Sequence, residues 1–324
     1  MPRLPAARCL PGGFLFLALA FFLSGCAAVQ SERLLATAAA FPNPVELDAV
    51  PFFPQEDYQC GPAALATVLD WSGVSVTPSE LTPQVYLPER HGSLQPELIA
   101  ATRRHGRVAY VLQPQLESLV AEVASGSPVL VLQNLGLSWH PTWHYAVVVG
   151  FDLGKDEIYL RSGRERRHVI PLETFEHTWK RSDYWAMVAL PPQQLPFTAE
   201  ESAYLQSVAA LERIGRNDTA EQAYGVALTR WPRSLGALMG LGNTRYARGD
   251  LGGADTAFRR AVEFHPQSAA AYNNLAQTLA DQHKYEQAET FARRAVELAS
   301  GSALLEPLQQ TLADIVKARA DVAQ

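Results

Sequence analysis

The sequence predicts an α+β domain followed by an all-α stack of helical repeats. Two patterns predict the α+β domain: an apolar helical spacing that starts at Cys60, and β-branched strands over 143–152 and 157–162. A third pattern predicts the repeats, because alanines recur at a shift of 34 residues in the last third of the chain. At 324 residues the chain is long enough for two domains, each with its own core.

The composition is that of a globular protein, with 48% hydrophobic and 19% charged residues. The net charge of −6 argues against a nucleic-acid partner, since such proteins usually carry a basic patch. The short basic cluster Arg164, Arg166 and Arg167 is interpreted as the solvated face of a hairpin.

The first residues have the features of an export signal. Arg3 and Arg8 precede an apolar run over 14–23, which is too short for a spanning helix of roughly 20 residues. The run ends in Leu-Ser-Gly-Cys26, which resembles a bacterial lipobox whose cysteine is acylated after cleavage. Lipid on Cys26 would attach the protein to a membrane. Ala27 follows the cysteine in place of Asp, and by that resemblance this favours the outer membrane, facing the periplasm.

No clear period follows Cys26, so this stretch is expected to be a tether. Composition shifts and the prolines around 191–196 indicate the remaining boundaries. The predicted segments are a signal peptide over 1–25, a tether over 26–47, a middle domain over 48–192, repeats over 198–302, and a capping helix with a tail over 303–324.

Cys60 is the single thiol outside the N-terminal segment, so it has no disulfide partner there and no cysteine-rich zinc site. It stands where a helix is predicted to begin, with Pro62 in the first turn and Gly73 as the stop. The unpaired N–H groups and the positive dipole end of a helix favour thiolate over thiol. Gly61 leaves room for a substrate beside the sulfur.

A nucleophilic thiolate needs a base and an oxyanion donor, and the sequence offers a candidate for each. His144 begins the buried strand over 143–152 and is the candidate base. Gln55 lies five residues before Cys60, and its side-chain amide is the candidate donor beside the Cys60 N–H.

Gln55, Cys60-Gly-Pro-Ala and His144-Tyr, with the apolar strand that leads to Gly150-Phe-Asp152, together resemble the C39 peptidase family, in its C39-like branch without a transporter. The resemblance covers roughly residues 48–190. It implies a papain-like fold, a nucleophile helix packed on an antiparallel sheet. It also implies that Cys60 is the nucleophile, His144 the general base and Gln55 the oxyanion glutamine.

The chain departs from the family at the third catalytic position, where an Asp is usual. Ser162 occupies the expected place and would orient the imidazole only weakly. Asp152 lies at the far end of the histidine strand, about 25 Å away at the rise of a β-strand, so it cannot substitute. Glu165 is a possible but less favoured substitute across the hairpin.

Two further motifs of the middle domain are weaker. The loop 90–93 either borders the cleft or, as the favoured interpretation, caps the helix predicted over 94–104. His140 and His144 are four residues apart, but Pro141 lies between them and a strand follows, so they do not form a helical metal pair. We expect no metal and no cofactor.

The last third resembles three tetratricopeptide repeats at about 201–234, 235–268 and 269–302, followed by a capping helix over 304–318. Small residues stand in register where paired helices would cross, and turn residues lie between them. These positions are Ala220, Ala254 and Ala288; Ala227, Ala261 and Ala295; and Gly215, Gly249 and His283. Such stacks bind peptides or proteins in a concave groove, for which the candidates are Asn243, Arg245, Asn273, Asn274 and Gln277.

These features lead to one functional hypothesis and one alternative. The hypothesis is a membrane-anchored cysteine peptidase that cuts a peptide or protein substrate, with repeats that recruit the substrate or a partner protein. The alternative is a binding lipoprotein in which a weak or inactive peptidase-like domain serves as a scaffold. The missing Asp favours the alternative, whereas the presence of Gln55, Cys60 and His144 favours the peptidase.

Overall fold

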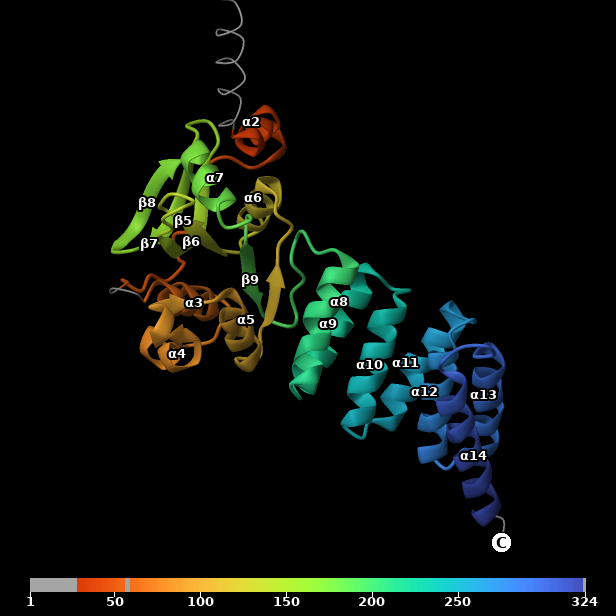
Figure 1. Cartoon of the computed structure of the whole chain (residues 1–324). Helices are drawn as coiled ribbons and strands as arrows, with labels where there is room; N and C mark the ends of the chain where they lie inside the picture. The colour runs from red at the N-terminus through yellow and green to blue at the C-terminus, as the bar shows by residue number, and fades with distance from the viewer. Residues whose placement is uncertain (1–27, 56–58, 323–324) are drawn as a thin grey trace, which may run out of the picture.

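The computed structural model describes residues 28–55 and 59–322. A sheet with helices on both faces forms the middle domain, and a run of paired helices extends away from it to the C-terminus (Figure 1). The fold class is therefore an α+β domain followed by an all-α stack, and this part of the sequence prediction is confirmed. No helix among the described residues is long and apolar enough to cross a membrane. The predicted signal peptide and Cys26 lie outside the described residues.

The main sheet of the described residues has seven strands in the order β4-β9-β5-β6-β7-β8, with β1 paired to β6. Each of these pairings is antiparallel. A small second sheet pairs β2 with β3. The strands are β1 Val45–Glu46, β2 Tyr86–Leu87, β3 Gly92–Ser93, β4 Val108–Val111, β5 Val129–Asn134, β6 Trp143–Asp152, β7 Glu157–Ser162, β8 Glu165–Pro171 and β9 Ala186–Leu190.

Strand β6 is buried on both faces of the sheet, which explains its continuous run of apolar residues. Ala146 and Val148 point into the core under helices α6 and α7, whereas Tyr145 and Val147 point into a second core under α3 and α5. The helices of this domain are α2 Val29–Ala36, α3 Cys60–Trp71, α4 Pro78–Val85, α5 Gln95–Arg104, α6 Leu116–Ala124 and α7 Leu172–Lys180, with 3-10 turns η2 Ala38–Ala40 and η3 Pro88–Arg90.

Helix α3 begins at Cys60 as predicted, and Pro62 lies in its first turn. Residues 61–69 are buried against the sheet, so this helix is held by packing on all sides. The chain leaves the helix through Gly73, which has a left-handed φ of +87°. The packing therefore fixes the sulfur-bearing end of the helix at the edge of the core.

The expected tether is wrong for residues 29–46, which are part of the folded domain. Helix α2 packs beside α6 and α7 (Figure 1), and β1 joins the sheet. The N–H groups of Gln30 and Ser31 donate to the carboxylate of Glu176 at 3.1 and 2.6 Å, and the Ser31 hydroxyl donates to it at 2.7 Å. A carboxylate at the start of a helix satisfies N–H groups that have no partner within the helix. The eight residues of α2 show only a weak helical pattern in the sequence, so this contact with a distant segment stabilises the helix.

Each predicted repeat contains one antiparallel helix pair. The helices are α8 Glu201–Arg213 and α9 Asn217–Arg230, α10 Leu235–Ala247 and α11 Leu251–Phe264, α12 Ala269–Asp281 and α13 Tyr285–Leu298, followed by α14 Leu305–Val322. The alanines that share a register are buried where the helices cross, and helix α14 covers the end of the stack.

The first helix pair is fixed to the middle domain. The buried carboxylate of Glu122, on α6, accepts hydrogen bonds from the N–H and hydroxyl of Thr198 at 2.8 and 2.6 Å. The Tyr110 hydroxyl, on β4, donates to the Thr198 carbonyl and accepts from the Glu200 N–H. Tyr204 of α8 lies in the same hydrophobic core as β4. The stack and the sheet therefore share one continuous core.

Candidate active site

Cys60 is the first residue of α3, and its thiol faces the start of β6. Backbone N–H groups of Tyr145 and Gly61 donate to the sulfur. Tyr145 directly follows His144, so these contacts bring the nucleophile candidate to the residue beside the base candidate. Both Cys60 and His144 line one cavity.

His144 is the second residue of β6, and its imidazole is held by β7. The Nε2 atom lies 2.9 Å from the Ser162 hydroxyl oxygen. Ser162 is the last residue of β7, in the position where the family's Asp was expected. Because Nε2 is engaged by Ser162, Nδ1 is the ring nitrogen left to exchange a proton with a thiol.

Gln55 is hydrogen-bonded to β6 and to the first residue after β7. Its N–H donates to the Gly163 carbonyl at 2.9 Å, and its Oε1 accepts from the Gly163 N–H at 3.1 Å. Its Nε2 donates to the Tyr145 carbonyl at 3.3 Å. An amide nitrogen carries two hydrogens, so one remains to donate to an oxyanion in the cavity.

The cavity has a volume of about 1070 Å³, and Gln55, Cys60 and His144 share its lining. Its other walls include the segment 90–95, residues 140–142 of the β5–β6 connection, Trp143 at the start of β6, and residues 181–183 after α7. A space of this size accommodates an extended segment of several residues rather than a single side chain.

Burial keeps the two reactive groups neutral near pH 7. Burial raises the pKa of the Cys60 thiol, and the N–H groups that donate to the sulfur offset this only in part. Burial, with a smaller contribution from the charge of His168, lowers the pKa of His144 to about 4. The resting pair is therefore a thiol and an uncharged imidazole.

The acidic residues considered as substitutes lie elsewhere. Asp152 is at the opposite end of β6, where its carboxylate contacts Lys155 at 3.1 Å and Asn43. Glu165 lies across the hairpin but pairs with His168 at 3.0 Å. Ser162 is the partner that the structure gives to His144.

The favoured interpretation of residues 90–93 as a capping loop is wrong. Helix α5 begins after Leu94, and no side chain caps it. Instead the loop lines the cavity, and the buried Ser93 Oγ has no hydrogen-bond partner among the described residues. A Cβ on Gly61 would lie 2.3 Å from that oxygen, so the loop packs directly on the first turn of α3.

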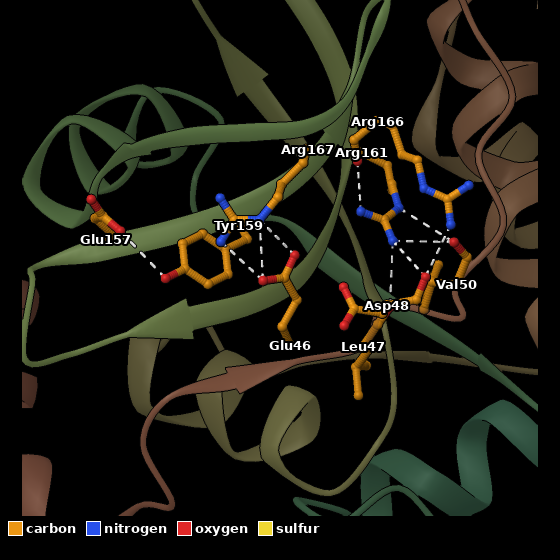
Figure 2. Close-up of polar contacts among 9 residues, drawn as sticks. All are labelled: Glu46, Leu47, Asp48, Val50, Glu157, Tyr159, Arg161, Arg166 and Arg167. Atoms are coloured by element: carbon orange, nitrogen blue, oxygen red, sulfur yellow. Dashed lines mark hydrogen bonds and ion pairs between the residues drawn. The ribbon is translucent and has the colours of Figure 1, made fainter.

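Arg161 positions the site, a role that the sequence analysis missed. Its side chain is 3% exposed and donates to the carbonyls of Leu47, Asp48 and Val50, at 3.4, 3.1 and 3.3 Å (Figure 2). These bonds fasten the segment that leads to Gln55 onto the strand that ends at Ser162. A charged residue next to the apolar residues Ile158 to Leu160 was the available signal.

The neighbouring arginines of the hairpin are exposed, as the sequence analysis expected of this cluster. Arg167 pairs with Glu46 at 2.8 Å and lies over the Tyr159 ring (Figure 2). Arg166 donates to the Asp48 carbonyl, and Arg164 lies at the cavity. Among the described residues, no group of three or more His, Cys, Asp or Glu side chains is placed to hold a metal ion.

The helical stack has a smaller hollow of about 210 Å³. Asn243, Asn273, Asn274 and Gln277 line it, four of the five residues proposed for the groove. Arg245 does not line it, because its guanidinium pairs with Glu221 at 3.0 Å.

Comparison with known families agrees with this division of the chain. Residues 47–187 match the model of the Peptidase_C39 like family. Residues 205–263 and 240–303 match the model of the tetratricopeptide repeat. The chain joins a C39-like domain to tetratricopeptide repeats. Comparison with curated proteins found no match.

Solved structures resemble either part at low identity. For the C39-like domain, a C39-like protein from Bacillus anthracis is 18% identical, with a TM-score of 0.39, over 46% of this chain and 98% of that one. For the repeats, the first such domain of Spaghetti (RPAP3), bound to an HSP90 peptide, is 17% identical, with a TM-score of 0.35, over 37% and 93%. The secretion chaperone SycD of Yersinia enterocolitica is 14% identical, with a TM-score of 0.36, over 38% and 94%.

Proposed function

We propose that the protein is a cysteine peptidase that cuts a peptide or protein substrate in the cavity of the C39-like domain. The observation that carries the proposal is that Cys60, His144 and Gln55 line one cavity, with Ser162 bonded to His144. Two segments that are far apart in the sequence, 55–60 and the start of β6, supply a nucleophile, a base and an oxyanion donor to the same space.

The chemistry follows from the neutral resting pair. As the Cys60 sulfur attacks the substrate carbonyl, its proton passes to Nδ1 of His144, while Nε2–H donates to Ser162. Gln55 Nε2 and the Cys60 N–H stabilise the oxyanion. Collapse breaks the C–N bond, and the amine leaves with the proton from His144. Water then hydrolyses the thioester, with His144 as the base.

The test is cleavage of a random peptide pool by the purified protein, followed by mass spectrometry. We expect wild type to produce new peptide termini and Cys60→Ala to produce none above background. His144→Ala should lower the rate by at least about 100-fold, the usual contribution of a general base. Gln55→Glu keeps the side-chain size but removes the donor and should lower kcat rather than binding. If wild type and Cys60→Ala give the same products, the domain is not a peptidase.

A binding scaffold is the second candidate, and two observations favour it. The partner of His144 is a hydroxyl instead of a carboxylate, and burial disfavours the charged forms of both His144 and Cys60. In this case the Cys60→Ala protein would bind the same peptides as wild type, and neither protein would cut them.

We further propose that the repeats recruit a substrate or partner protein through the hollow lined by Asn243 and Asn274. The amide of Asn274 donates to that of Asn243 at 3.0 Å, and the buried Asn273 Oδ1 has no partner among the described residues. Pull-down with Asn243→Ala/Asn274→Ala, compared with wild type, tests this role. If the variant and wild type recover the same proteins in the same amounts, the hollow does not recruit them.

Membrane anchoring through lipid on Cys26, with the protein on the periplasmic side of an outer membrane, is also proposed. The lipobox-like sequence and Ala27 support it. Labelling with a fatty-acid probe and membrane fractionation, in wild type and Cys26→Ser, test it. An unlabelled wild-type protein in the soluble fraction would overturn it.

A further inference from the structure

The cavity of the C39-like domain is lined by cationic side chains. Arg90, Arg164 and Arg181 all contribute to its lining. Asp183 is the single acidic residue among the lining residues that the structure describes. This local excess of positive charge contrasts with the net charge of −6 of the whole chain.

The three arginines come from different elements and surround the site. Arg90 ends the turn η3 before the loop that packs on Gly61, and Arg164 lies in the β7–β8 turn. Arg181 follows α7, and its Nη1 donates to the carbonyls of Asn134 and Gly136 at 3.3 and 2.7 Å. Arg181 is thus held in place by backbone oxygens, which leaves its charge without a carboxylate partner.

No carboxylate of the described residues neutralises these three arginines. Arg90, Arg164 and Arg181 form no ion pair with any residue of 28–55 or 59–322. Some exposed arginines outside the cavity pair with a carboxylate, as Arg167 does with Glu46 and Arg259 with Asp255, whereas Arg166 bonds only a backbone carbonyl. The cavity therefore keeps guanidinium groups available for a ligand, and each can bind a carboxylate through two parallel hydrogen bonds.

We propose that the cavity selects peptide segments that carry Asp or Glu on either side of the bond to be cut. This inference rests on the proposed peptidase function and names its substrate class. Arg164 and Arg90 bind substrate carboxylates at the rim, and Arg181 adds a fixed positive charge beside Asp183. A rim with an excess of positive charge also concentrates negatively charged substrates before they bind.

The experiment compares two pools of quenched fluorescent nonapeptides that differ only in Glu replaced by Gln. We measure kcat/KM for each pool with the full-length protein, and binding of each pool to the Cys60→Ala protein. Wild type should prefer the Glu pool by about threefold or more, because each exposed ion pair contributes roughly a 1.4-fold to fivefold effect and three arginines act together. The preference should fall with added salt, because salt screens and so weakens exposed ion pairs.

We expect a lower ratio of kcat/KM for the Glu pool to that for the Gln pool in each of the single variants Arg90→Gln, Arg164→Gln and Arg181→Gln. In the triple variant this ratio should be close to one. Asp183→Asn should raise it. Arg166→Gln is the matched control, since it removes the same charge two residues from Arg164 at a side chain that bonds Asp48 and does not line the cavity. The preference of the control should equal that of wild type.

The two hypotheses fail separately. Equal cleavage of both pools overturns the acidic preference and leaves the peptidase standing. No cleavage, with arginine-dependent binding of the Glu pool to the Cys60→Ala protein, overturns the peptidase and supports the acidic site. No cleavage and equal binding of both pools overturn both.

Discussion

Acidification should destabilise the C39-like domain through His144. In the folded protein burial lowers the pKa of this group from 6.5 to about 4. The unfolded chain therefore binds a proton more tightly, and stability is lost as pH falls from about 6.5 to about 4. With these two values, the loss between pH 8 and pH 5 is about 2 kcal/mol for this group alone.

The assay is urea unfolding followed by tryptophan fluorescence at pH 8 and pH 5. In His144→Gln the buried group no longer titrates, so the pH-dependent loss should be smaller than in wild type by about 2 kcal/mol. His140→Gln, an exposed residue at the same cavity, is the control and should behave as wild type. Equal losses in wild type and His144→Gln would refute the argument that burial holds His144 neutral.

Three further predictions follow from single contacts. Gly61→Ala places a Cβ against Ser93 Oγ and should lower the free energy of unfolding by about 1–3 kcal/mol, measured by thermal unfolding. Adding Ser93→Gly to this variant should restore the stability. A single variant as stable as wild type would contradict the contact. Glu176→Ala leaves the first N–H groups of α2 unpaired, so trypsin should cut after Arg33 faster than in wild type. An unchanged cleavage rate would mean that other contacts hold α2. Ser162→Ala removes one hydrogen bond to the base and should lower kcat about twofold to tenfold, and an unchanged kcat would exclude Ser162 as the orienting residue.

Local patterns predicted the elements that bear the reactive side chains. Helix α3 starts at Cys60 because an apolar face and a proline in the first turn specify it within twelve residues. The β-branched run after His144 likewise specifies a buried strand without help from distant segments. The repeats were predictable for the same reason, since each unit restates the same spacing of alanines.

Contacts between distant segments were beyond such reasoning. Helix α2 exists because Glu176, 145 residues away from Ser31, accepts its first N–H groups. The Arg161 contacts with residues 47–50 are equally non-local. The walls of the cavity are also non-local, because Arg90 and Arg181 line the same space only once the domain has folded. Sequence periodicity specifies elements, whereas a cavity depends on how those elements are brought together.

The junction at Glu122 and Tyr110 has a consequence for how the two parts would cooperate. Because the first helix pair shares a core with the sheet, the repeats cannot swing a captured chain toward Cys60. Any protein held by the stack would have to reach the cavity with a flexible segment of its own. The effective concentration of its scissile bond would then depend on the length of that segment, highest where the segment just spans the gap and lower for longer ones. The fixed position of the repeats would therefore favour bound proteins whose flexible segments are long enough to reach the cavity and not much longer.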